Sequence, residues 1–120
     1  MDNYDWYAMG IEVIEHSDRT GGYTLWFKPQ AKHKTGYVVG NGNKGIKVES
    51  IKDMEASYLA SVMRYWYDQG YEGIDTWKHG SQWYIDPCRH YSTSYTAVWV
   101  GRTLGEHSIY DIGSQKAFVL

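Results

Sequence analysis

The sequence contains little that would cross-link the chain or carry it into a membrane. A single cysteine, Cys88, excludes an internal disulfide and suits a reducing compartment. No apolar run approaches the roughly 20 residues that a membrane-spanning helix needs. The N-terminal stretch MDNYDWYAMG lacks a basic region followed by an apolar one, so we expect no signal peptide. These absences predict a cytoplasmic protein that makes no contact with a membrane.

Neither sign of charge dominates the composition. The formal net charge is −2, whereas nucleic-acid-binding domains usually carry a basic excess and DNA mimics a strong acidic one. The 120 residues suffice for one domain of ordinary size, spanning residues 1–120. Aromatic residues make up 17%, mainly twelve tyrosines and six tryptophans. Such rings either pack a core or lie at a protein–protein surface, and composition alone leaves both interpretations open.

Hydrophobic periodicity predicts an α+β fold with two α-helices and a largely antiparallel β-sheet. One helix is expected after Ser50, a candidate N-cap, and would end at Gly70. A second is expected within residues 92–106, where hydroxyl residues precede an apolar stripe. Short apolar runs bounded by turn residues predict strands at residues 5–16, 23–28, 36–40 and 46–50, in a hairpin over 74–86, and at 107–112 and 116–120.

Residues 28–47 hold five lysines and one histidine but no carboxylate. Asn-Gly within GYVVGNGNKGIKVES predicts a hairpin that pairs residues 36–40 with 46–50. Lysines beside an aromatic ring suit a negatively charged partner, since lysine contacts phosphates and tyrosine stacks on bases. The candidate partner-binding residues are therefore Lys32, Lys34, Tyr37, Lys44 and Lys47. The alternative is that these lysines are solvated and protect an exposed sheet edge from aggregation.

No pattern in the sequence identifies catalytic residues, a metal site or a cofactor. Cys88 and His90 form one close pair, but zinc needs three or four converging ligands. Asp86 and Asp111 would do acid–base chemistry only if they lay close together and were differently buried. GNGNKG precedes a strand-like segment, whereas a phosphate-binding loop opens a helix. The sequence therefore favours a protein that is not an enzyme.

Residues 77–112 combine a WYID strand, a helix ending in GRTLGE and the segment SIYD. This pattern resembles small accessory proteins of bacteriophages and prophages. The match is carried by Trp77, Trp83, Tyr84, Ile85, Asp86, Ala97, Gly101, Arg102, Gly105, Glu106, Ser108, Ile109, Tyr110 and Asp111. The resemblance implies an origin rather than a reaction, and it implies no catalytic residue.

Three functional hypotheses follow. The first is a non-enzymatic phage or prophage accessory protein that binds a host protein or ribonucleoprotein complex in the bacterial cytoplasm, for instance an anti-CRISPR inhibitor of host defence. The second is nucleic-acid binding through the lysine-rich loop and hairpin. The third is a small-molecule or nucleotide-binding protein, or an enzyme, with an aromatic-lined cleft. A symmetric homodimer formed through exposed sheet edges is left open.

Overall fold

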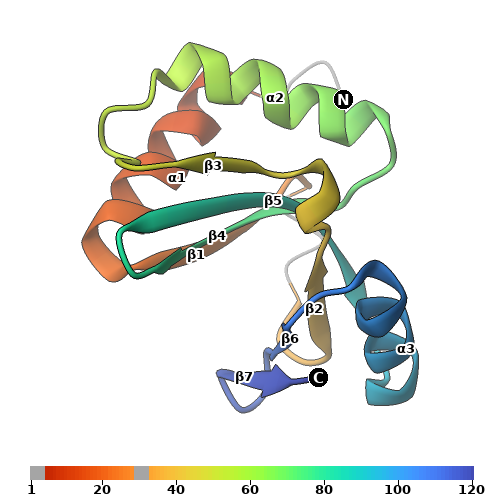
Figure 1. Cartoon of the computed structure of the whole chain (residues 1–120). Coiled ribbons are helices and arrows are strands. Elements are labelled where there is room, and N and C mark those ends of the chain that lie inside the picture. Colours follow the sequence, from red (N-terminus) through yellow and green to blue (C-terminus); the bar gives the residue numbers. More distant parts are fainter. Residues whose placement is uncertain (1–4, 29–32) are drawn as a thin grey trace.

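The computed structural model describes residues 5–28 and 33–120, which form three α-helices, a short 3₁₀ helix and an antiparallel sheet. The predicted α+β class is confirmed, with one helix more than expected. In chain order the elements are α1 (Trp6–Thr20), β1 (Gly22–Trp26), β2 (Tyr37–Gly40), η2 (Gly42–Lys44), β3 (Ile46–Val48), α2 (Ala56–Asp68), β4 (Gly73–His79), β5 (Gln82–Tyr91), α3 (Ser94–Leu104), β6 (Ser108–Asp111) and β7 (Lys116–Val119) (Figure 1).

The N-terminal segment is helix α1, so the strand predicted over residues 5–16 is wrong. Apolar residues alternate between Tyr7 and Val13, but the buried positions recur at three- and four-residue steps, which is the helical period. They are Trp6, Gly10, Val13 and Ser17. Asp5 caps the helix, because its carboxylate accepts a hydrogen bond from the backbone N–H of Ala8 at 2.9 Å.

The remaining predicted elements are largely confirmed. The helix expected after Ser50 begins at Ala56, because Ile51–Met54 forms a turn first. The helix expected within residues 92–106 is α3, capped by the Thr93 side chain. The 74–86 hairpin is the pair β4–β5, and the two C-terminal strands are β6 and β7.

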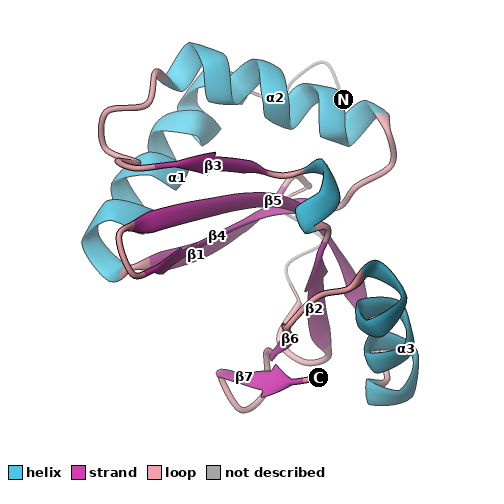
Figure 2. Cartoon of the chain, in the orientation of Figure 1, coloured by secondary structure: helices cyan, strands magenta, loops and turns pink. Residues whose placement is uncertain are grey.

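The long strand β5 organises the sheet. The strand order is β1-β4-β5-β2-β6-β7, and β3 also pairs with β5. Helices α1 and α2 cover one face of β1, β3, β4 and β5, whereas α3 lies beside β2 and β6 (Figures 1 and 2). The sheet therefore curls away from the two-helix layer toward its C-terminal strands.

β2 and β3 do not pair with each other, so the predicted hairpin over residues 36–50 is wrong. Both pair with β5: Tyr37–Gly40 lies opposite Tyr91–Cys88, and Ile46–Val48 lies opposite Ile85–Trp83. The Asn-Gly signal forms η2 instead, and the chain continues in the same direction. Pro87 explains the interruption. The carbonyl of Pro87 accepts a hydrogen bond from the Asn41 backbone N–H at 2.9 Å, so Pro87 faces the junction between β2 and β3. Proline has no N–H to donate to a strand on that side, and the pairing is interrupted there.

Two hydrophobic clusters stabilise the described chain. The larger contains twelve buried residues between the sheet and helices α1 and α2, among them Leu59, Met63 and Ile74. The smaller contains Val39, Ala97 and Ile109, between α3 and strands β2 and β6. No described helix combines the length and the apolar character that a membrane span would require.

Candidate functional site

Helices α1 and α2 leave one face of the sheet uncovered (Figure 1). A cleft of about 1380 Å³ is lined by residues of this face. One wall comes from β1, β4 and β5. The other comes from β2, η2, the α3–β6 connection and β7. The curl of the sheet brings these two walls to face each other, and we call this hollow the sheet-face cleft. The pairing of β4 with β5 decides which side chains reach this cleft. Side chains alternate between the two faces of a strand, so odd-numbered residues of β4 and even-numbered residues of β5 lie on the cleft side.

A row of side chains crosses the sheet at one end of the sheet-face cleft. Trp77 lies opposite Tyr84, and their rings stack with centroids 4.4 Å apart at 14°. Tyr84 lies opposite Lys47, whose Nζ is 5.6 Å from the Tyr84 centroid. The neighbour of Trp77 on β1 is Gly22, which has no side chain. The outer face of the Trp77 ring therefore has no cross-strand cover, and the residue is 39% exposed.

The adjacent row carries two carboxylates. Asp75 and Asp86 are directly opposite each other on β4 and β5, and Thr24 lies opposite Asp75 on β1. Thr24 donates a hydrogen bond from Oγ1 to Asp75 Oδ1 at 3.0 Å. The Trp77 side chain donates to Asp86. Like charges opposite each other on a sheet are unfavourable, so each carboxylate disfavours ionisation of the other.

Burial, more than repulsion, raises the pKa values of these two carboxyl groups. The pKa of Asp75 is raised to about 7, mainly by burial and to a smaller extent by the neighbouring Asp86 and Glu106, against the hydrogen bond from Thr24. Burial likewise raises the pKa of Asp86 to about 6, aided by Glu106 and opposed by Trp77 and Lys47. Perturbed pKa values of this kind are common at functional sites.

Glycines make room for the acidic groups. A methyl group at Gly40 would lie 3.6 Å from Asp86 Oδ2 and 3.8 Å from Asp75 Oδ2, so both carboxylates converge on this backbone. A methyl group at Gly45 would overlap Asp86, at 1.9 Å from Oδ1. The third carboxylate, Glu106, accepts a hydrogen bond from the backbone of Gly42 at 3.1 Å. Burial raises the pKa of Glu106 as well.

The candidate lysines are distributed rather than gathered. Lys34 is exposed ahead of β2, and Lys44 is exposed in η2, past the other end of that strand. Tyr37 is half-buried and pairs with Tyr91 and Asp111 in the sheet. Lys32 lies outside the described residues. Lys47 extends over Tyr84 in the sheet-face cleft, so the structure groups it with rings and carboxylates.

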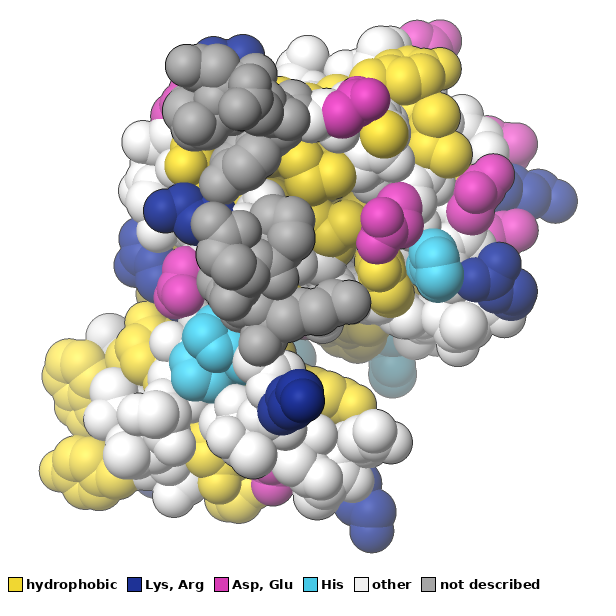
Figure 3. Space-filling view, turned by 180° about the vertical axis from the view of Figure 1, so that it is seen from behind, with side chains coloured by type: hydrophobic (Ala, Val, Ile, Leu, Met, Phe, Trp, Pro, Cys, Tyr) yellow, Lys and Arg dark blue, Asp and Glu magenta, His cyan; other side chains and the backbone are white. Residues whose placement is uncertain are grey.

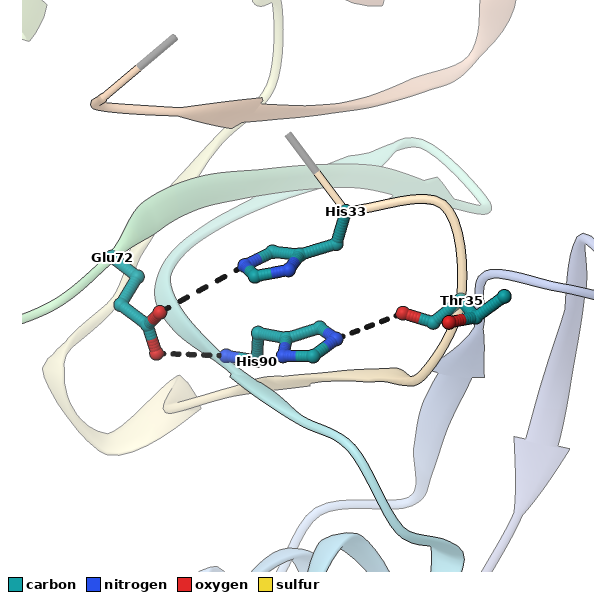
Figure 4. Close-up of polar contacts among 4 residues, drawn as sticks. All are labelled: His33, Thr35, Glu72 and His90. Carbon is teal, nitrogen blue, oxygen red and sulfur yellow. Dashed lines mark hydrogen bonds and ion pairs between the residues drawn. The ribbon is translucent and has the colours of Figure 1, made fainter. Parts of the chain in front are cut away.

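A second polar group lies farther along the same face of the sheet. The rings of His33 and His90 stack with centroids 3.5 Å apart (Figure 4). Glu72 Oε1 accepts from the His90 backbone at 3.1 Å, and Oε2 is 4.0 Å from His33 Nε2. His90 Nε2 is 2.8 Å from the Thr35 carbonyl. Burial lowers the pKa of His33. These contacts anchor the chain ahead of β2.

The structure gives Cys88 and His90 no joint role in chemistry. Cys88 is fully buried, and burial raises the pKa of its thiol, which disfavours the nucleophilic thiolate. His90 contacts His33 and Thr35. Within residues 5–28 and 33–120, no set of three or more His, Cys, Asp or Glu side chains is arranged to hold a metal ion.

The key residues of the cleft were largely missed by sequence reasoning. Asp86 was considered with Asp111, but its partner is Asp75, whereas Asp111 Oδ1 accepts from Gly113 in the β6–β7 turn. The signal was present in the hairpin itself. A two-residue turn at Gly80 and Ser81 places His79 opposite Gln82. Counting back along both strands from that pair places Trp77 opposite Tyr84 and Asp75 opposite Asp86.

Comparison of the chain with protein-family models, curated proteins and solved structures finds no significant match. The resemblance to phage accessory proteins therefore stays a prediction, and function is argued from the geometry of the chain.

Proposed function

We propose that this protein binds a small organic molecule in the sheet-face cleft. One observation carries the proposal: an aromatic stack with an uncovered end and a pair of cross-strand carboxylates line the same hollow. Binding sites typically combine such apolar walls with a few convergent polar groups. Trp77 supplies the stacking surface, and Asp75 and Asp86 supply hydrogen-bonding groups for orientation. The hypothesis of an aromatic-lined cleft gains support from this arrangement.

The carboxylate pair would also allow proton transfer to or from a bound molecule. A group whose pKa lies near neutrality is both donor and acceptor at that pH, and Asp75 has a pKa of about 7. Recognition is nevertheless the function that the site supports best, because the stack and the glycine-lined floor shape a binding surface and do not specify a bond to be broken.

A ligand screen tests this proposal. Thermal unfolding is followed with a panel of amines, amidines, neutral sugars and nucleotides at millimolar concentration. We expect at least one chemical class to raise the Tm, and we expect Trp77→Ala to abolish the shift. Trp99→Ala is the matched control, because Trp99 is 63% exposed on α3 outside the cleft lining. The proposal fails if no class raises the Tm, or if the shift persists in Trp77→Ala.

A second candidate function, binding of a protein partner, is favoured by the surface of α3 and β7. Hydrophobic side chains gather over this part of the molecule (Figure 3). Tyr95 is 83% exposed, Trp99 63% and Phe118 44%, and they line a hollow of about 630 Å³ together with Arg102. Exposed rings beside an arginine are typical of the centres of protein interfaces. We call this the α3 ring surface.

The hypothesis of a phage accessory protein that binds a host macromolecule would use the α3 ring surface. Tagged protein is incubated with bacterial lysate, and bound proteins and ribonucleoproteins are identified by mass spectrometry. A specific partner should be lost with Trp99→Ala and retained with Trp77→Ala, the reverse of the pattern expected for the cleft ligand. Retention by both variants would exclude this surface.

A further inference from the structure

The aromatic stack in the sheet-face cleft already holds a cation at one end. Lys47 Nζ lies 5.6 Å from the centroid of Tyr84, within the range of a cation–π interaction. Trp77 forms the other end of the same stack. Gly22 leaves its outer face without a cross-strand side chain, and the His79 ring lies tilted at 59° with its centroid 6.1 Å from that of Trp77. Tryptophan binds cations more strongly than tyrosine does. The uncovered end is thus the better cation-binding end.

The charges around the uncovered end are mainly negative. Among the described residues, the cleft is lined by three carboxylates, those of Asp75, Asp86 and Glu106, by one lysine, Lys47, and by two histidines, His79 and His107. Thr24 lies two positions after Gly22 on β1 and donates a hydrogen bond to Asp75 Oδ1. This bond draws the carboxylate of Asp75 toward β1, which is the side of the sheet that the uncovered face of the Trp77 ring faces. A cation there would have a ring on one side and a carboxylate beside it.

The ring geometry selects a flat cation. Trp77 and Tyr84 are nearly parallel, so a third group that continues the stack presents a plane to Trp77. Guanidinium and amidinium groups are planar, stack on aromatic faces and donate paired hydrogen bonds to carboxylates. We infer that the sheet-face cleft binds a planar organic cation, a guanidinium or amidinium group, stacked on Trp77 and paired with Asp75. This inference rests on the proposed function and names the ligand class.

Proton release is the expected signature of such binding. A cation favours the ionised form of Asp75, whose pKa lies near neutrality because of burial. The titratable groups that face Asp75 are Asp86 and Cys88 from β5 and Glu106 from the α3–β6 connection, and Lys47 from β3 faces Asp86. Two histidines, His79 of β4 and His107 beside Glu106, line the same cleft. Binding should therefore release protons near neutral pH, and affinity should rise as the pH increases from about 5.5 to about 8.

Benzamidine and benzamide provide the test, because they have nearly the same shape and only benzamidine is charged. Isothermal titration calorimetry at neutral pH, in two buffers of different ionisation enthalpy, gives the affinity and the number of protons released. We expect benzamidine to bind roughly tenfold or more tightly than benzamide, with proton release. Asp75→Asn should remove that preference and the release, and Trp77→Ala should weaken both compounds. Asp68→Asn, an exposed carboxylate at the end of α2, is the control.

The source of the cation is distinguished by a second titration. Agmatine represents a free guanidinium compound, and an acetylated, amidated Gly-Arg-Gly peptide represents an arginine side chain of a protein. Tighter binding of agmatine supports a small-molecule ligand, and tighter binding of the peptide supports an arginine-bearing partner; either supports the planar cation. Equal affinity for benzamide and benzamidine, or no proton release, overturns the inference and leaves the proposed function standing. Absence of binding by every compound, including the sugars and nucleotides of the screen, overturns both.

Discussion

At the residue scale, Asp75 and Asp86 should make the folded state less stable as the pH rises. The pKa of Asp75 is raised by burial from 3.8 to about 7 in the folded chain. A carboxyl group whose folded pKa exceeds its unfolded value stabilises the fold when protonated, and this contribution is lost as the pH rises from about 4 to about 7. Asp86, with a pKa of about 6, acts in the same direction. The site therefore lowers stability at neutral pH.

Replacing Asp75 by asparagine should raise the free energy of unfolding at pH 8 by about 1–3 kcal/mol. The amide keeps an oxygen that accepts from Thr24, so the hydrogen bond at 3.0 Å is preserved while the charge is removed. At pH 4 the variant and the parent should unfold at nearly the same denaturant concentration. Urea titrations at the two pH values measure the difference, and Asp68→Asn should change neither midpoint. Equal effects at pH 4 and pH 8 would contradict the assignment.

Gly45→Ala tests how tightly Asp86 is held against β3. The added methyl group would overlap the carboxylate at 1.9 Å and lie 2.8 Å from the Ile85 carbonyl. The backbone at Gly45 is extended, a conformation that alanine adopts without strain, so any destabilisation would come from the steric overlap alone. We expect a loss of about 1–3 kcal/mol in the free energy of unfolding. Gly113→Ala, where the nearest atom is 3.6 Å from the added methyl, is the matched control. Equal stability of the two variants would contradict the close packing.

At the element scale, helix α1 shows where periodicity could predict the fold and where it could not. The segments with one dominant period, α2, α3 and the β4–β5 hairpin, were predicted from spacing and turn residues. Residues 6–13 fit both periods, because apolar residues occupy Trp6, Tyr7, Met9, Ile11 and Val13 together. Packing on α2 decides between them, and packing is not visible in a local pattern.

The hairpin predicted for the β2–β3 segment is wrong for a related reason. Asn-Gly favours a tight turn wherever it occurs, but a hairpin also needs the two flanking strands to be each other's best partners. Here β5 is long enough to pair with both, and Pro87 interrupts the ladder between them. The competing partner is more than 30 residues away in the chain, and the candidate lysines are separated for the same reason. Of the features that form the candidate site, only the pairing register of the β4–β5 hairpin could be predicted from the sequence, because it depends on a local turn.

Gly10 should be essential for the contact between α1 and α2. A methyl group at this position would lie 2.8 Å from the Ala56 carbonyl oxygen, a backbone atom at the start of α2. Helix propensity alone favours alanine over glycine by about 1 kcal/mol. We expect the clash to reverse that sign, so that Gly10→Ala lowers the Tm. Glu15→Ala, on the exposed side of the same helix, should leave the Tm within a few degrees of the parent. A higher Tm for Gly10→Ala would show that the helices separate without cost.

At the scale of the whole molecule, the sheet-face cleft lies between two parts of unequal stability. The part with α1, α2, β1 and β4 contains the twelve-residue cluster, whereas α3, β2 and β6 enclose only Val39, Ala97 and Ile109 among the described residues. Since buried apolar area is the main stabilising term, the C-terminal part should open locally at a lower free energy than the rest. A ligand in the cleft touches both parts and would couple them.

Hydrogen exchange measured by mass spectrometry tests this difference. In the free protein, peptides from α3 and β6 should exchange faster than peptides from α2 and β4, although all four lie in regular elements. Ala97 is fully buried, and Ala97→Gly costs roughly 1 kcal/mol in helix stability, so exchange in α3, β2 and β6 should accelerate about fivefold. Exchange in α2 and β4 should stay unchanged, because their protection depends on the larger cluster. Uniform acceleration along the chain would instead show that the two clusters unfold as one unit, and a cleft ligand would then stabilise the whole sheet at once.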